Sequence, residues 1–396
     1  MRTTRLTAVT IPSRPLVHAR RALAAALLAA AIAACDRRDA DPLSPRTTRG
    51  IDSTDAESTA FPTSRDVYRW PFAQQSPWNL PIGNGAVYVP AGFQRANWMG
   101  VDRELIVRAA DGDPLVPVYA PGSWERRCSG TSNPQWDWIG GLRLRLPASL
   151  VVPDAAPPST PNNVTTIIQP DGRSLVGIAP FARCEAGGPA YGWTATQANE
   201  PLEDIFADGL RGAHGGSGLS GLGGSIRLGE LTGNDPIRHA LKLNVWAQRY
   251  LFYDAADGTP GYRWPARNAD NYAAGVYGGR VRAVEQGTLL AIPPSISLAS
   301  LGLVTRPGRR IARALQDYGA YIVDDSAWDA YDLNAEAGVA EEFAQRYGYP
   351  MSTNSGPWFE DMMRIVAVLH AVDNNTPATI GGGGVRRRPL APPFAP

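Results

Sequence analysis

Short runs in which apolar and polar residues alternate dominate the first two-thirds of the chain, and Gly, Pro and Asp interrupt them. Alternation with a period of two is typical of strands that bury one face. Asp171-Gly172 separates two apolar runs and supplies the positive φ of a tight turn, so residues 164–168 and 175–178 predict a β-hairpin. The pattern predicts further strands at residues 86–89, 104–108, 115–119, 142–146, 225–228, 239–245, 280–284 and 288–292.

Apolar positions spaced by three and four residues appear only in the last third of the chain. They predict helices at residues 309–318, 337–347 and 358–372, with His370 on the last of these and a buried strand at residues 321–324. We therefore expect an α+β fold that is mainly antiparallel β, a sandwich or jelly roll, with C-terminal helices packed on the sheet.

The composition of the 396 residues fits one large globular domain or two modest ones, because 44% are hydrophobic and only 19% are charged. A coiled coil or a wholly disordered chain has a different composition. The 38 basic residues nearly balance the 37 acidic ones, so the chain lacks the basic excess of a nucleic-acid-binding protein. We expect no nucleic-acid partner, and the sequence leaves the oligomeric state open.

The first 35 residues predict where the protein is located. Five Arg residues precede an apolar run at residues 22–34 that is too short for a permanent membrane span. The run ends in Ile32-Ala33-Ala34-Cys35, which resembles the lipobox of bacterial lipoproteins, whose Cys is diacylated. This resemblance implies a signal peptide at residues 1–35 and an extracytoplasmic protein, periplasmic or on the outer surface, that a lipid on Cys35 anchors to the membrane. An ordinary cleaved signal peptide is the alternative.

The rest of the chain divides into three parts by composition. Residues 36–65 are rich in Asp, Arg, Ser, Thr and Pro and predict a flexible linker. Residues 66–379 predict a single globular domain, and residues 380–396 a tail rich in Gly, Arg and Pro that lies over its surface. Because exported compartments oxidise thiols, we expect Cys128 and Cys184 to form a disulfide.

Residues 216–221 match the G-x-G-x-x-G pattern, but a strand-like segment follows them instead of the helix that a dinucleotide site needs. They predict a loop whose backbone closely approaches another strand or a ligand. Three His residues remain beyond residue 35, so we expect neither a metal centre nor a cofactor.

The densest polar chemistry begins at this loop, which carries His214. A turn at residues 234–236 allows His239 to return beside Glu230, and a carboxylate next to an imidazole favours a general base. Arg227 or Arg238 would then neutralise the uronate of an acidic sugar. A structural ion pair between Glu230 and one of these Arg residues is the alternative interpretation.

Residues 262–277 interleave aromatic, basic and acidic side chains, a mixture that suits a sugar. Trp264 and Tyr272 would stack on sugar rings, Arg267 and Asp270 would bind hydroxyl or carboxylate groups, and Tyr277 would exchange a proton. Burial of the indole in the core is the alternative for Trp264.

Asp324 and Asp325 follow an apolar strand, which makes Asp324 a candidate acid or base partner for Glu230. A turn or a helix N-cap is the competing interpretation of this pair.

Several blocks together resemble a group of secreted bacterial proteins, some of which carry carbohydrate-binding modules: residues 76–83, 222–231, 237–241, 262–266, 287–293 and 314–324. The resemblance implies secretion and association with glycans. We therefore expect a membrane-tethered, carbohydrate-active enzyme that cleaves a polysaccharide by elimination or hydrolysis. A non-catalytic glycan-binding or envelope-organising lipoprotein is the alternative.

Overall fold

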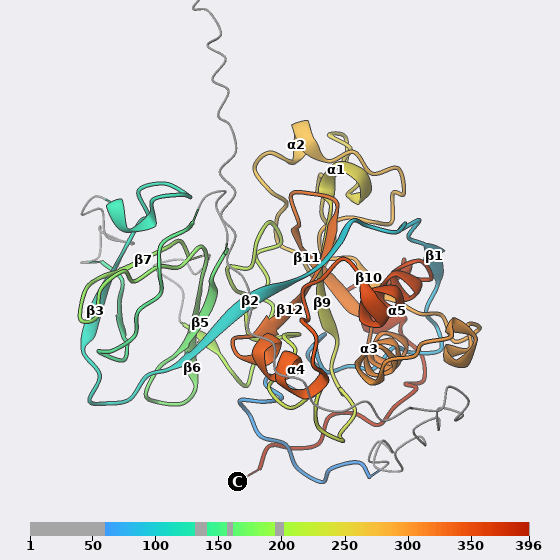
Figure 1. Ribbon diagram of the computed structural model, residues 1–396, viewed down its shortest axis with the longest axis horizontal. Helices are drawn as coiled ribbons and strands as arrows, with labels where there is room; N and C mark the ends of the chain where they lie inside the picture. The colour runs from blue at the N-terminus through green and yellow to red at the C-terminus, as the bar shows by residue number, and fades with distance from the viewer. Residues whose placement is uncertain (1–59, 131–140, 157–160, 195–201, 396) are drawn as a thin grey trace, which may run out of the picture. The chain divides into compact units, whose positions relative to one another are not determined.

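The computed structural model describes residues 60–130, 141–156, 161–194 and 202–395 (Figure 1). The predicted signal peptide, Cys35 and most of the predicted linker lie outside these residues. Within the described ranges, no helix has the length and apolar character needed to cross a membrane.

A ten-stranded sheet organises the fold, with the strand order β1-β13-β10-β11-β9-β12-β2-β5-β6-β8. The pairs β11–β9, β12–β2 and β2–β5 are parallel and the other pairs are antiparallel. The strands are β1 (Tyr88–Pro90), β2 (Trp98–Arg108), β5 (Val164–Ile168), β6 (Ser174–Ile178), β8 (Glu203–Asp204), β9 (Leu241–Val245), β10 (Leu289–Ala291), β11 (Ala320–Asp325), β12 (Ala330–Glu336) and β13 (His370–Val372).

The predicted α+β class is confirmed, and the sheet is mixed instead of purely antiparallel. Alternation along a strand reports that one of its faces is buried, but it carries no information about the direction of the neighbouring strands. The predicted hairpin is present as β5 and β6, with Gly172 at a φ of 66° in its turn.

A smaller sheet has the order β4-β3-β7, formed by β3 (Leu115–Tyr119), β4 (Arg143–Arg145) and β7 (Ala190–Tyr191). Its buried residues Val118 and Leu144 share a hydrophobic cluster with Ile167 and Val176 of β5 and β6. The disulfide between Cys128 and Cys184 is formed, as predicted, close to this sheet. Cys128, Cys184 and Asp154 lie close enough to share a metal ion, but the two sulfur atoms are bonded to each other and are therefore not thiolate ligands.

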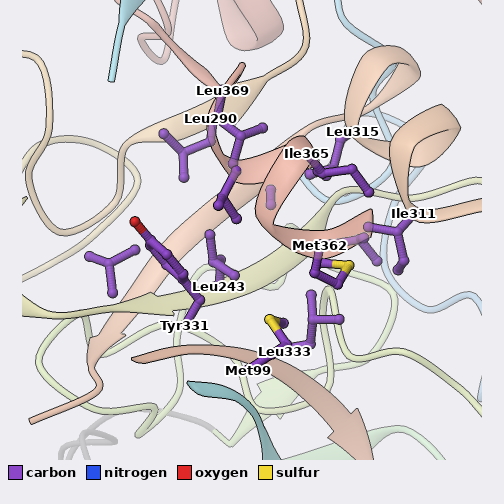
Figure 2. Packing of buried hydrophobic residues seen from close by; sticks show 14 of the residues in the cluster. Met99, Leu243, Leu290, Ile311, Leu315, Tyr331, Leu333, Met362, Ile365 and Leu369 are labelled. Atoms are coloured by element: carbon purple, nitrogen blue, oxygen red, sulfur yellow. The ribbon is translucent and has the colours of Figure 1, made fainter. Parts of the chain in front are cut away.

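Three helices pack on one face of the central strands, as Figure 1 shows. They are α3 (Arg306–Asp317), α4 (Val339–Tyr347) and α5 (Gly356–Val366), while α1 (Ala247–Tyr250) and α2 (Ala273–Val276) are single turns. Figure 2 shows the core that results, in which α3 and α5 meet strand residues. The labelled members are Met99, Leu243, Leu290, Ile311, Leu315, Tyr331, Leu333, Met362, Ile365 and Leu369.

Three expected elements differ from the structure. Residues 225–228 contribute only a single bridge between Ile226 and Ala335, and residues 280–284 form no strand. The last helix ends at Val366, and His370 lies on β13. The first two segments alternate apolar and polar residues as a strand does, and the third has the apolar spacing of a helix, but a short pattern alone does not distinguish a strand from a loop or locate the end of a helix.

The two ends of the described body are held together. Arg65, which the sequence assigns to the linker, is buried and donates hydrogen bonds to the carbonyl oxygens of Pro71 and Pro392 at 3.0 and 2.8 Å. In the predicted tail, Arg386 donates to Pro81 O at 3.0 Å and Arg388 pairs with Asp317 at 2.8 Å. Residues 380–395 therefore form specific contacts with the folded body.

Candidate functional site

Glu230 and His239, which the sequence expects to meet, are in direct contact. The His239 Nε2 atom lies 3.0 Å from Glu230 Oε1, and its Nδ1 atom lies 2.9 Å from the carbonyl oxygen of Ala240. Burial disfavours the imidazolium, but the Glu230 carboxylate outweighs burial and raises the pKa of His239. Burial likewise opposes the Glu230 carboxylate, yet His239 brings the pKa of Glu230 below its ordinary value. The pair is therefore stable as an ion pair.

This ion pair is enclosed by protein. His239 and Arg227 are only 5% and 3% exposed, and the cavity next to them has a volume of about 10 Å³, which is enough for one water molecule but not for a sugar ring. Arg227 Nε pairs with Glu336 at 3.2 Å, and its backbone N–H donates to Glu230 at 2.7 Å. Arg238 donates instead to Ala60 O. The contacts of this group suit a structural role.

A second polar group lies on the sheet face opposite the three helices. Along β2, β9 and β12, one set of alternate residues enters the helix-covered core and the other set is polar. A register shift in β11 after Ile322 brings Asp324 beside Asn244 of β9. We call this set the polar face; it consists of Asp102 and Glu104 (β2), Lys242 and Asn244 (β9), Asp324 (β11), and Asp332 and Asn334 (β12).

A chain of amide groups connects the carboxyl groups of the polar face. Asn162 donates to Asp324 at 3.1 Å and approaches Asp102 at 3.4 Å, while Asn244 donates to Asp102 at 3.1 Å. Asn334 in turn donates to Asn244 at 2.9 Å. The amide nitrogen of Asn162 therefore lies between the carboxyl groups of Asp102 and Asp324.

Several of these carboxyl groups hold a proton more tightly than an exposed carboxyl does. Burial, followed by the neighbouring Asp102 and Asp325, raises the pKa of Asp332 to about 8. Burial and the neighbouring Asp270 and Asp102 raise the pKa of Asp324 well above its ordinary value. Burial also raises the pKa of Asp102 and of Asp270, which lies near Asp325. Crowded, buried carboxyl groups of this kind are suited to proton donation near neutral pH.

Exposed aromatic rings border these carboxyl groups. Trp98, 38% exposed, shares the strand face of Asp102, and both its ring and the Asp332 carboxyl fill the space over Gly100. Tyr272, 44% exposed, lies with its hydroxyl 3.4 Å from Asp325 Oδ2. Indole and phenol rings stack on the C–H faces of sugars, so the border of the polar face has the chemistry of a glycan subsite.

The Gly-rich loop closes the other end of the polar face. A Cβ atom on Gly216 would lie 2.6 Å from Asp270 Oδ2, and Gly215 would collide with Asp324, so neither position accommodates a larger residue without a shift. This confirms the prediction that the backbone of the loop closely approaches another group. The groups that it approaches are the side chains of Asp270 and Asp324. His214 of this loop is buried with its Nε2 atom 2.9 Å from Glu104.

Some side chains of the predicted sugar-binding segment, residues 262–277, lie against the buried carboxyl groups, and others lie partly or fully in solvent. Tyr277 donates to Asp270 Oδ2 at 2.6 Å, and burial and that carboxylate raise the pKa of Tyr277, which keeps its phenol protonated. Trp264 is half-buried, and Arg267 is exposed and donates its backbone N–H to Ser217 at 2.9 Å. The predicted site residues that the structure brings together at the polar face are therefore Asp270, Tyr272, Tyr277 and Asp324, and His214 contacts Glu104 of the same face.

The sequence interpretation missed Trp98, Asp102, Asp332 and the amide chain. A signal for this site was present in two segments, Trp98-Met-Gly-Val-Asp-Arg-Glu104 and Ala330-Tyr-Asp-Leu-Asn-Ala-Glu336. In the first, Asp102 and Glu104 are two residues apart, and in the second, polar residues recur at positions 332, 334 and 336. Such alternation is usually attributed to a solvated face. Only the three-dimensional pairing of β12 with β2, which places Asp332 opposite Gly100, shows that the polar residues converge.

Comparisons with protein-family models, with curated proteins and with solved structures each found no match. The geometry of the polar face is therefore the basis for a functional proposal.

Proposed function

We propose that this protein is a glycoside hydrolase in which Asp332 of the polar face and the neighbouring Asp325 cleave a glycan by acid–base catalysis. The observation that carries the proposal is the juxtaposition of Asp332, with its pKa of about 8, with Asp325, Asp102 and the exposed Trp98. Glycoside hydrolysis requires one protonated carboxyl to donate to the leaving oxygen and a second carboxylate to act as nucleophile or base. In this proposal Asp332 is the proton donor and Asp325 is the second group.

Hydrolysis is favoured over elimination by the charges around the site. Elimination needs a base to remove a proton and a cation to neutralise a uronate, whereas Tyr277 stays protonated and Arg227 and His239 are enclosed with their own partners. Asp325, the carboxylate of this proposal, would repel a uronate at the site of cleavage. We therefore propose a neutral sugar unit at the point of cleavage, with Trp98 and Tyr272 stacking on the rings beside it.

The proposed location is the bacterial envelope, outside the cytoplasm, with the protein anchored through a lipid on Cys35. The disulfide between Cys128 and Cys184 supports an oxidising compartment. Intact-mass analysis of the protein purified from membranes tests the anchor, because diacylation adds the mass of two acyl chains to Cys35.

A panel of neutral and acidic polysaccharides tests the activity of the purified protein. The proposal predicts new reducing ends from a neutral glycan, without the absorbance near 235 nm of an unsaturated product, and a loss of about 10²–10⁴-fold in Asp332→Asn. The exposed Asp111→Asn is the matched control and should retain activity. Saturable glycan binding without any product would instead support the non-catalytic alternative, and an unsaturated product would support elimination.

A further inference from the structure

Exposed aromatic side chains gather around the turn that joins β11 to β12. The described residues include six exposed aromatic side chains, and three of them, Trp98, Tyr272 and Trp328, belong to this region. Trp328 is 46% exposed and lies in the turn itself, three residues after Asp325 and four residues before Asp332. Single exposed apolar residues are common on proteins, whereas a group of exposed rings beside polar residues points to a binding surface.

Hydrogen bonds hold this turn in one conformation. Asp325 Oδ1 accepts the backbone N–H of Ala327 at 2.8 Å, and the buried Ser326 hydroxyl lies 2.9 Å from Trp328 O and 3.0 Å from Ala330 O. Ala327 has a φ of 61°, in the left-handed region that a residue with a Cβ atom rarely adopts. Strain of this kind persists only where surrounding contacts impose it, and it clusters at binding and active sites. The turn therefore presents Trp328 from a preorganised backbone.

The turn also contacts the start of β2, which carries Trp98. Asn97 Nδ2 donates to Asp329 Oδ2 at 2.7 Å, and the Asn97 backbone N–H donates to Asp329 O at 3.1 Å. Trp98 is the register partner of Ala330, the first residue of β12. Trp98 and Trp328 are therefore exposed on neighbouring segments at the same end of the paired strands β2 and β12.

We propose that Trp328 forms a sugar-binding subsite next to the point of cleavage and selects glycan chains over single sugar units. The inference rests on the function proposed above, because Asp325 and Asp332 define where cleavage occurs. An indole stacks on the C–H face of a sugar ring and needs no charge on it, so the subsite suits a neutral unit. This unit is not the one whose bond to the leaving group breaks, so a substrate with one sugar unit gains nothing from Trp328.

Steady-state kinetics of the full-length protein test the subsite with two substrates, the glycan that the wild type cleaves and the glycosyl fluoride of its single unit. Trp328→Ala should raise KM for the glycan about tenfold with little change in kcat, and Trp328→Phe should recover part of the loss because it keeps a ring. Neither variant should change kcat/KM for the fluoride. The matched control is Trp193→Ala, because Trp193 is a 44% exposed Trp that follows β7 of the smaller sheet. An unchanged KM in Trp328→Ala, an equal loss on both substrates or an equal effect of Trp193→Ala would overturn the subsite.

Binding without cleavage separates the subsite from the hydrolase proposal. In native gels that contain each glycan of the panel, Asp332→Asn should be retarded by at least one of them. Asp332→Asn/Trp328→Ala should need about tenfold more of that glycan for the same retardation. If the wild type binds a glycan through Trp328 and cleaves none, the hydrolase proposal fails and the binding role of Trp328 stands. If Asp332→Asn binds no glycan, or binds equally well without Trp328, the subsite is refuted whether or not the wild type is active.

Discussion

Replacement of Lys242 by Met should strongly destabilise the protein, because it removes the cation at the centre of the polar face. Lys242 is 0% exposed, and its Nζ atom lies 2.5 Å from Glu104 Oε1 and 3.1 Å from both Ser220 O and Gly221 O. Three acceptors match the three N–H groups of an ammonium, so we take Lys242 to be charged. Burial lowers the pKa of Lys242, and Glu104 offsets this only in part.

The magnitude follows from what the substitution leaves behind. In Lys242→Met the buried Glu104 carboxylate keeps His214 and Ser225 as neighbours but loses its closest cation. Breaking a buried ion pair in this way costs about 3–5 kcal/mol, a large share of the 5–15 kcal/mol of a typical domain. Removal of both charges in Lys242→Met/Glu104→Gln should restore most of that free energy of unfolding.

Urea denaturation followed by near-ultraviolet circular dichroism measures these differences. The exposed pair Arg173–Asp204, at 2.6 Å, is the matched control, and Arg173→Gln should cost less than about 1 kcal/mol. A Lys242→Met variant as stable as the control, or a double variant no more stable than Lys242→Met alone, would refute the reasoning.

Three further predictions concern other parts of the fold. The folded-state pKa of His239 is raised, chiefly by Glu230 against the opposing effect of burial, so its pairing stabilises the protein fully below the unfolded pKa of about 6.5 and stops doing so as the pH rises through the folded value. In urea titrations the stability gap between wild type and His239→Gln should therefore shrink as the pH rises above about 6.5, and a constant gap would contradict the ion pair. Gly216→Ala should lower the unfolding free energy by about 1–3 kcal/mol because its Cβ would meet Asp270, whereas Gly258→Ala, with open space around it, should not; equal thermal stability of the two variants would exclude the clash. Cys184→Ser opens a disulfide that spans 56 residues and should cost about 4 kcal/mol in urea, an effect that should vanish when both proteins are reduced.

The fold was predictable from the sequence wherever a pattern has one structural meaning. Asp171-Gly172 between two apolar runs specified the β5–β6 hairpin, and the three-and-four spacing of Ile311 and Leu315 specified α3. The contact of Glu230 with His239 was also predictable, because a turn signal lies between two residues of complementary charge. The catalytic roles assigned to them remain predictions, and the enclosed cavity beside them favours a structural one.

The polar face was not predictable in the same way. Asp102, Asn244 and Asp332 lie in three segments that are far apart in sequence, and the order β9-β12-β2 brings them together. Nothing in a local pattern encodes the parallel pairing of β12 with β2, or the register shift that turns Asp324 toward Asn162. The alternation in each strand indicates that one face of that strand is polar. Only the pairing of the strands shows that these polar faces are adjacent.

The proton-donating role of Asp332 is the centre of the functional account, and the leaving-group dependence of Asp332→Asn tests it most directly. The sugar oxygen that leaves a natural glycan has to be protonated as the bond breaks. The nitrophenolate of a nitrophenyl glycoside is a good leaving group and departs without a proton from the enzyme. On the glycan cleaved by the wild type, the account predicts that kcat/KM falls above about pH 8 in the wild type and is about 10²–10⁴-fold lower in Asp332→Asn, while both proteins cleave the nitrophenyl glycoside at similar rates. Equal cleavage of the glycan by the two proteins, or an equal loss on both substrates, would contradict it.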